Sequence, residues 1–188
     1  MGEIAQQLGH FTDHVHYRAT AHAYARVWTS LALTHTNVTG TGKQPHQMRH
    51  AKLAYQQEDS WGLLYNLWGD RVLGLGLWPR DLYEDQDAWY ATHRERYGVP
   101  LDSRHKWTKT DWLCFSAAMA TTRKGRDLFI DSLYNYLQAG KVNAGFPDLY
   151  ETTTGSFPGR EGLDFPLEFI ARPVVGWVDP RILVLALS

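Results

Sequence analysis

Apolar residues recur every three or four positions along several stretches of this chain, which is the period of an amphipathic α-helix. A first short helix over residues 4–8 is predicted to end at Gly9. A long helix follows, capped by Thr12 or Asp13 and continuing to about His35. Its apolar face comprises Tyr17, Ala21, Tyr24, Trp28, Leu31 and His35. A face of this length must pack against another apolar surface.

A second amphipathic helix is predicted over residues 61–75, with Asp59 or Ser60 as its cap. Its stripe consists of Trp61, Leu64, Tyr65, Trp68, Val72 and Leu75. Gly74 and Gly76 end it, because glycine tolerates the backbone conformation that follows a helix.

Three further helices are predicted from the same period and from their end signals: residues 80–97 between Pro79 and the stops Gly98 and Pro100, residues 111–120 after the cap Thr110, and residues 123–140 after the cap Thr121 or Thr122. The last of them turns Leu128, Phe129, Leu133, Tyr136 and Leu137 inward and ends at Gly140. Together with the first two, these helices place the fold in the all-α class, as antiparallel helical hairpins.

The segments between the helices lack this period. Residues 36–50 read as a loop, and their histidines do not have the spacing of a known metal site, so no metal is expected. Residues 51–55 read as a short extended piece. Residues 143–177 are rich in Gly, Pro and Thr, which predicts a long irregular C-terminal loop region that builds a site or packs as a strap through its aromatic residues. The tail from Pro180 reads as a short helix or a buried extended segment.

Composition limits the functions this fold can serve. The 188 residues are expected to form a single domain, and 44% hydrophobic residues with 13% aromatics are enough for a core. A net charge of −1 without basic runs disfavours nucleic acid, and no apolar run is long enough for a membrane span. Cys114 is the only cysteine, which excludes an internal disulfide, and its neighbours predict burial. Asn37, in the sequon Asn-Val-Thr, is a candidate glycosylation site and favours secretion, although no signal peptide is recognisable.

Residues 97–112 concentrate polar chemistry in a loop between helices. The loop carries Asp102, Ser103, Arg104, His105, Lys106, Trp107, Thr108, Lys109, Thr110, Asp111 and Trp112. Loops set on a helical scaffold are where binding and catalysis commonly occur. The alternative is a solvated connection whose acids and hydroxyls cap turns and helix ends.

Five blocks of sequence, in this order and spacing, resemble the six-hairpin domain of the fungal glutaminase A family: SWGLLYNLWGDRVLGLGL, YGVPLDSRHKWTKTDW, RDLFIDSLYNYL, DLYETTTGSFPG and ARPVVG. IAQQLG, HYRATAHAYARVW and HAKLAY also fit, so the resemblance covers residues 4–176. It implies an α/α-toroid of helical hairpins, as in six-hairpin glycosidases, with the site formed by loops at one end. It also implies a secreted hydrolase that converts L-glutamine to L-glutamate and ammonia, with no cofactor.

Two departures from the family pattern shape our expectations. The family domain continues upstream of this chain, so we expect residues 1–188 to be a fragment that forms only part of the toroid. A second glycine is expected after Gly176, where Trp177 stands instead. Helix faces that would contact absent hairpins are apolar, so self-association into a homo-oligomer, or a repacked bundle, is expected.

Glutamine hydrolysis needs specific groups, and the loops offer candidates for each. Arg104 or Arg172 could hold the substrate carboxylate, and Asp102 or Glu151 its ammonium. Asp111, with Lys109 and Thr108 or Thr110, could form a base-activated threonine, and Tyr150, Glu151 and Thr152 offer an alternative group. Among the candidates, a histidine such as His105 is the residue type most easily poised near neutral pH. The competing interpretations are a helix cap for Thr110 and Asp111, a turn for Asp102, and an ion pair of Arg104 with Asp102 or Glu151.

Two other functions use the same residues. A glycoside hydrolase could employ Asp102, Asp111 or Glu151 as acid and base, with Trp107 or Trp112 stacking on a sugar. A non-catalytic secreted protein could instead use its exposed helix faces to bind itself or another protein. Release of ammonia, release of sugar, and inactive oligomerisation separate the three.

Overall fold

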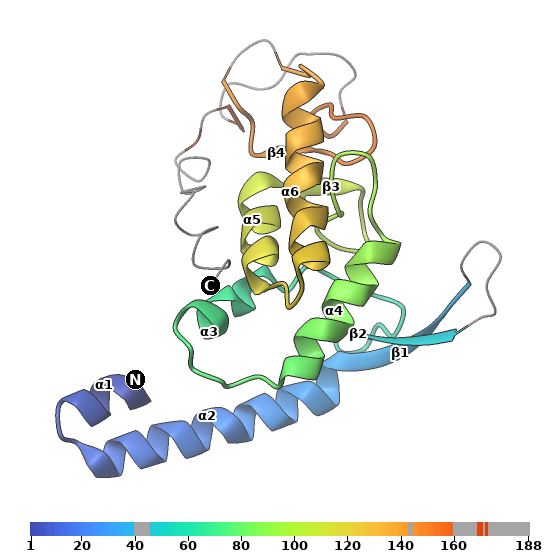
Figure 1. Ribbon diagram of the computed structural model, residues 1–188. Helices are drawn as coiled ribbons and strands as arrows, with labels where there is room; N and C mark the ends of the chain where they lie inside the picture. Colours follow the sequence, from blue (N-terminus) through green and yellow to red (C-terminus); the bar gives the residue numbers. More distant parts are fainter. Residues whose placement is uncertain (40–45, 143–144, 160–168, 171, 173–188) are drawn as a thin grey trace.

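The computed structural model describes residues 1–39, 46–142, 145–159, 169–170 and 172 (Figure 1). The helices are α1 (Gly2–Gln7), α2 (Phe11–Ala32), the 3-10 turn η1 (Tyr65–Leu67), α3 (Trp68–Val72), α4 (Arg80–Thr92), α5 (Thr110–Met119) and α6 (Arg123–Gln138). The strands are β1 (Leu33–Val38), β2 (His46–Ala51), β3 (Trp107–Lys109) and β4 (Leu149–Glu151). The predicted tail from Pro180 and most of the ARPVVG block lie outside the described residues.

The core forms where α4, α5 and α6 pack together in the centre of the molecule (Figure 1). A three-residue connection folds α5 and α6 back on each other, and Thr122 caps α6 by accepting a hydrogen bond from Gly125 N at 3.0 Å, as predicted. The largest fully buried side chains of this body include Tyr90, Leu113, Phe129 and Tyr150. Leu137 was predicted to point inward but is exposed.

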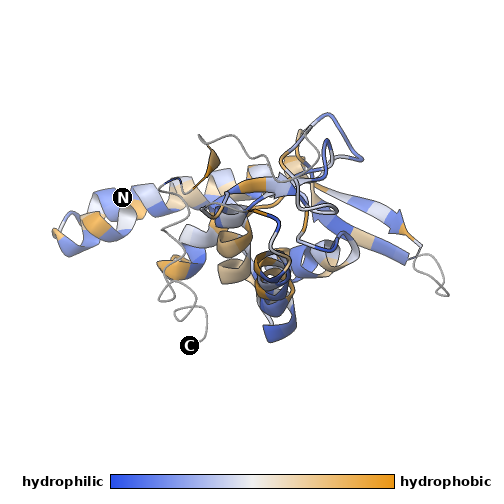
Figure 2. Cartoon of the chain, turned by 90° about the horizontal axis from the view of Figure 1, so that it is seen from above, coloured by the Kyte–Doolittle hydropathy of each residue, from blue (hydrophilic) through white to orange (hydrophobic). Residues whose placement is uncertain are grey.

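Helix α2 runs away from this body as a long arm, with α1 folded back along it (Figure 1). His10 occupies the cap position that was predicted for Thr12 or Asp13, and the helix ends at Ala32 rather than His35. Within it only Ala25 and Ala32 are buried, while Tyr24 is 72% exposed. The prediction that its apolar face is covered is therefore wrong for Tyr17, Tyr24 and Leu31, which are all exposed. Figure 2 shows apolar positions in orange along α2.

Strands β1 and β2 form an antiparallel hairpin where a loop was predicted, in register from Leu33 with Ala51 to Val38 with His46. Tertiary packing explains the difference. His50 is fully buried and stacks on Trp89 of α4 with ring centroids 3.8 Å apart, so the hairpin is held by the helical body. Asn37 lies on β1 with its side chain exposed, which is the surface setting a glycosylation sequon requires.

The helix predicted over residues 61–75 shrinks to residues 65–72. Its first part pairs with the polar loop instead: Leu63 N donates to Leu101 O at 2.8 Å, and Ser103 N donates to Trp61 O at 2.9 Å. These backbone bonds replace those of a helix, so tertiary pairing overrides the local period. Ser60 caps no helix; its hydroxyl accepts from the backbone of Leu53 and Ala54.

The described chain is largely helical, as predicted, but it is not purely α, because it contains two small two-stranded sheets. The arrangement of the hairpins as part of a toroid stays a prediction. Within the described ranges, every helix is too short or too polar to cross a membrane.

Candidate active site

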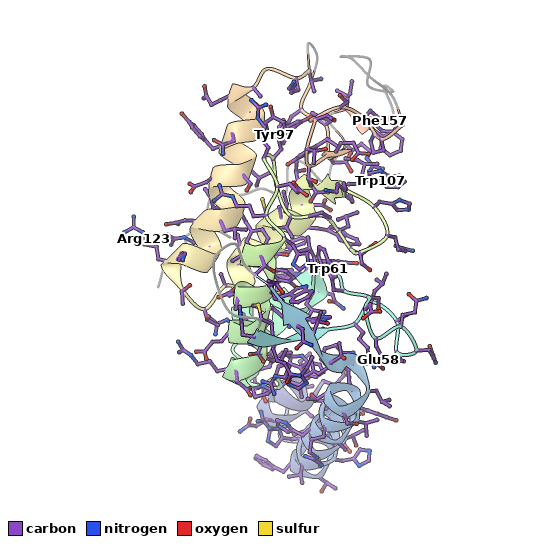
Figure 3. All side chains as sticks on the ribbon, turned by 90° about the vertical axis from the view of Figure 1, so that its right-hand side faces the viewer. Glu58, Trp61, Tyr97, Trp107, Arg123 and Phe157 are labelled. Carbon is purple, nitrogen blue, oxygen red and sulfur yellow. The ribbon has the colours of Figure 1, made fainter. Side chains whose placement is uncertain are left out.

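The polar loop of residues 97–112 and the segment of residues 148–154 meet through main-chain pairing. Strand β3 pairs antiparallel with β4, with Trp107 opposite Glu151 and Lys109 opposite Leu149. The ribbon lies at the end of the body where α5 begins, close to Tyr97 and Phe157 (Figure 3). Burial alternates along both strands, so Trp107, Lys109 and Glu151 occupy the half-buried face.

The opposite face of the ribbon is packed into the core. Tyr150 is fully buried, donates from its hydroxyl to Tyr97 O at 3.0 Å and stacks on Tyr136 at 3.7 Å. Burial raises the pKa of Tyr150 well above its usual range. These contacts give Tyr150 a packing role and leave none of its surface for a substrate.

Four charged side chains gather between the ribbon and the start of α5: Lys109, Asp111, Asp148 and Arg172. Lys109 Nζ lies 3.2 Å from Asp111 Oδ2 and 3.7 Å from Asp148 Oδ2. Arg172 donates through Nε to Asp148 Oδ1 at 2.9 Å and through Nη2 to Oδ2. The hydrogen bonds to Asp148 raise the pKa of Arg172. We call these four residues the charged cluster.

Asp111 is the member of the charged cluster that could still accept a hydrogen bond. It is 8% exposed, and its Oδ1 is buried without a hydrogen-bond partner in the described part of the chain. Asp111 lies in the first turn of α5, where the helix dipole favours a negative charge. A buried acceptor without a partner costs about 1–3 kcal/mol, so this oxygen calls for a functional explanation.

Thr110 was predicted to cap α5, but it does not. Lys109 occupies the cap position, and Thr110 is the first helical residue, with its backbone N–H donating to Asp148 O at 2.9 Å. The main chain next to β4 thus supplies the acceptor. The hydroxyls of Thr108 and Thr110 are both fully buried and have no partner among the described residues.

Asp102 and Arg104 form a separate unit, which confirms their interpretation as a turn and an ion pair. Asp102 accepts from Arg104 N at 2.9 Å, Nε at 3.0 Å and Nη2 at 2.8 Å. Burial alone would raise the pKa of Asp102, but the hydrogen bonds from Arg104 outweigh it and lower that pKa. The Arg104 side chain itself stays 64% exposed.

The outer edge of the ribbon is aromatic. His105 is exposed and stacks on Trp107, with the ring centroids 4.1 Å apart. Trp112 stacks on Tyr65 at 3.6 Å, and Lys109 Nζ lies 5.7 Å from the centre of the Trp112 ring. The Glu151 carboxylate, half-buried opposite Trp107, has no ion-pair partner within the described ranges.

Asp148 was missed by the sequence reasoning. It is fully buried, and both of its carboxylate oxygens are engaged by Arg172. A signal existed, because the residue precedes a short apolar strand in the resembling block DLYETTTGSFPG. An aspartate after a proline in a Gly-rich loop reads as a turn residue, however, which concealed the role.

Comparison with known proteins shows the family of the chain. The model of the glutaminase A six helical-hairpin domain matches residues 1–178, and the chain therefore belongs to the glutaminase A family. This confirms the resemblance drawn from the sequence.

Two relatives illustrate the relationship. Glutaminase A of Aspergillus oryzae is 39% identical over 176 residues, which cover 94% of this chain and 23% of the relative. A probable glutaminase of Arthroderma benhamiae is 30% identical over an alignment 204 residues long, gaps included, which covers 94% of this chain and 22% of the relative. The chain thus spans less than a quarter of the length of each of these two relatives. No solved structure matches it.

Proposed function

We propose that this chain carries an amide-hydrolysing site of glutaminase type, which converts L-glutamine to L-glutamate and ammonia. Family membership and the names of the two relatives support the reaction class. The observation that carries the assignment to these residues is the buried Asp111: its Oδ2 is held by Lys109, and its Oδ1 accepts no hydrogen bond from the part of the chain that the structure describes. A carboxylate with one free oxygen beside an ammonium group provides a base and an acid for amide cleavage.

The proposed steps use these two groups in turn. Asp111 Oδ1 takes a proton from a water molecule as the water oxygen bonds to the side-chain carboxamide carbon. Lys109 then gives a proton to the amide nitrogen, the carbon–nitrogen bond breaks, and ammonia leaves. The proton held on Asp111 Oδ1 returns to Lys109 through a water molecule, because the 3.2 Å contact joins Lys109 Nζ to the other carboxylate oxygen, Oδ2. Acid and base are thereby regenerated together.

Water is the proposed nucleophile because neither threonine hydroxyl is activated by a base. Within the described residues the hydroxyls of Thr108 and Thr110 have no hydrogen-bond partner, so neither donates to Asp111. For the ends of the substrate, Glu151 is the proposed partner of the ammonium, since it shares the half-buried face with Lys109. Arg104 is the proposed partner of the carboxylate: Asp102 holds its Nε and Nη2, so only the remaining Nη1 of this largely exposed side chain would bind the substrate.

The test is an ammonia-release assay on the purified chain with glutamine and asparagine, and glutaminase A of Aspergillus oryzae as positive control. Asp111→Asn is expected to lower kcat by about 100-fold or more, the usual contribution of a general base. Its melting temperature should fall, because Asp111 lies in the first turn of α5 rather than at its cap and Asn no longer pairs with Lys109, so an unchanged circular dichroism spectrum at the assay temperature is needed to show that the variant is folded. Asp127→Asn, which removes an aspartate–arginine pair on α6, is the control expected to keep activity.

Full activity of Asp111→Asn contradicts the proposal, as does a wild-type chain that releases no ammonia from glutamine. Sugar release from a glycoside panel in place of ammonia favours the glycoside hydrolase alternative.

Secretion with glycosylation at Asn37 belongs to the same proposal. The exposed position of Asn37 on β1 supports it. Expression through a eukaryotic secretory route should give a mass shift that endoglycosidase removes and that Asn37→Gln abolishes. A secreted product without such a shift contradicts the glycosylation.

A further inference from the structure

Asp148 joins three segments of the chain at one point. Its carboxylate holds Arg172 through two hydrogen bonds and lies 3.7 Å from Lys109 Nζ. Its backbone oxygen accepts from Thr110 N at 2.9 Å, and its backbone N–H donates to Phe169 O at 3.4 Å. The start of α5, the ribbon and the segment carrying Arg172 therefore share this fully buried residue.

Arg172 is also influenced by a second carboxylate, that of Asp111. Lys109 Nζ contacts both Asp111 and Asp148, so the two carboxylates flank a single ammonium group. The charge of Asp111 also acts on Arg172, as a further cause of its raised pKa after the contributions of Asp148. A guanidinium fork binds a carboxylate best through both oxygens, and only Asp148 receives it in this way.

We infer that Asp148 is a positioning residue: by occupying the Arg172 fork it keeps Asp111 Oδ1 free for the reaction. This inference rests on the proposed function of Asp111. The charged cluster holds two cations and two carboxylates, so each cation has a partner. Without the charge of Asp148, Arg172 and Lys109 would share Asp111 as their nearest carboxylate. Both of its oxygens would then be occupied, and the base would be lost.

The arrangement also explains how the charged carboxylate of Asp148 can be fully buried. A buried charge is tolerated when it is paired, and removing one partner leaves the other uncompensated. Arg172 is the more exposed partner and can turn to another acceptor, whereas Asp148 is fixed by its backbone bonds to Thr110 and Phe169. The acid is the fixed element and the arginine is the movable one.

The experiment compares Asp148→Asn, Arg172→Gln and the double variant in the glutamine assay. Asp148→Asn should lower kcat by about 10–100-fold with a smaller change in KM, the loss expected when reacting groups are misplaced. Arg172→Gln breaks the same ion pair but removes the competing guanidinium, so it should cost less. The double variant should recover several-fold over Asp148→Asn, because no arginine remains to occupy Asp111. Asp127→Asn again serves as the control.

A purely structural ion pair predicts another pattern: similar losses of melting temperature and of kcat in both single variants, and recovery of both together in the double variant, because no uncompensated charge remains. A loss of kcat that follows the loss of melting temperature in this way would overturn the inference. If Asp148→Asn folds poorly, Arg172→Gln and the double variant still test it, because both should keep activity once their folded fraction is taken into account.

A readout without turnover separates this inference from the proposed function. In a crystal structure of Asp148→Asn, or by NMR of the Arg172 Nε–H group, Arg172 should hydrogen-bond to Asp111. An Arg172 that stays away from Asp111 overturns the inference whether or not glutamine is hydrolysed. If instead only the proposed role of Asp111 is wrong, Asp111→Asn will keep full activity.

Discussion

The body formed by α4, α5, α6 and the β3–β4 ribbon contrasts with the arm formed by α1 and α2. Both arise from amphipathic helices with the same period. The body buries Phe129 and Tyr150 almost completely, whereas α2 leaves Tyr24, Val27 and Leu31 exposed over a helix of 22 residues. A helical period therefore specifies which face is apolar, but the partner that covers it must come from elsewhere in the fold.

The largest difference between body and arm should appear in stability. Phe129→Ala removes a ring packed against Tyr90 in the core, so it should lower the free energy of unfolding by about 3–5 kcal/mol. Tyr24→Ala on the arm should change it by less than about 0.5 kcal/mol, since it buries little. Urea denaturation measures both. Similar losses would show that Tyr24 is covered in solution.

The next largest expected effect is self-association, in which a second copy of the chain covers the apolar side of α2. Tyr17, Tyr24, Val27 and Leu31 follow one another at spacings of seven, three and four residues on one exposed side of α2. We propose that the chain self-associates through this side. Burying its apolar area should stabilise the oligomer by several kcal/mol, at about 25 cal/mol per Å². Light scattering at micromolar concentration should give a mass above 21.5 kDa.

The control for association is Tyr24→Glu combined with Leu31→Glu, which should give a monomer with an unchanged circular dichroism spectrum. A wild-type chain that is strictly monomeric and binds no apolar dye contradicts the proposal. An oligomer without ammonia release would instead favour the non-catalytic reading of the chain.

A smaller effect concerns the junction between the two regions, where His50 of β2 stacks on Trp89 of α4. Burial lowers the pKa of His50, and the charge of His93 adds to this. The unfolded state binds a proton near pH 6.5, whereas the folded state resists it. Stability should therefore be constant above that value and fall as the pH drops below it.

Melting curves at pH 7.5 and 5.5 test the junction. His50→Gln should reduce the fall in melting temperature, because the replaced side chain no longer takes up a proton on unfolding. An equal fall in wild type and variant would assign the pH dependence to other groups.

The smallest expected effect is on thiol chemistry. Burial raises the pKa of the Cys114 thiol to about 12, with a further contribution from Asp111. Cys114 should therefore react with a thiol reagent only in the unfolded protein, and Cys114→Ala should leave ammonia release unchanged. Rapid labelling of the folded chain would mean that α5 opens locally.

Most helices of the body could be predicted from the sequence, because their ends carry local signals such as Thr122 before α6 and Gly140 after it. The β1–β2 hairpin could not, since its register depends on His50 packing against a helix that comes about forty residues later. The helix over residues 61–75 was overpredicted for a related reason. Its backbone pairs with residues 101–103, and such distant partners leave no trace in a local period.

The candidate site was partly predictable for the same physical reasons. The polar loops were visible as concentrations of charge, and the turn made by Asp102 with Arg104 is a contact between close neighbours in sequence. The charged cluster is not local, because Asp148 and Arg172 are 24 residues apart. Nothing in the spacing of these two residues shows that the Arg172 guanidinium binds both carboxylate oxygens of Asp148.

The pairing of β3 with β4 has a consequence for how the molecule folds. Residues 107 and 151 are brought together only after the intervening helices have closed, and joining ends so far apart costs chain entropy before any ladder bond repays it. The ribbon should therefore form late, after the α5–α6 hairpin. Its amides, including those of Tyr97 and Thr152, should gain protection from hydrogen exchange in the last kinetic phase of refolding. A partly folded chain would have its helices but no assembled charged cluster.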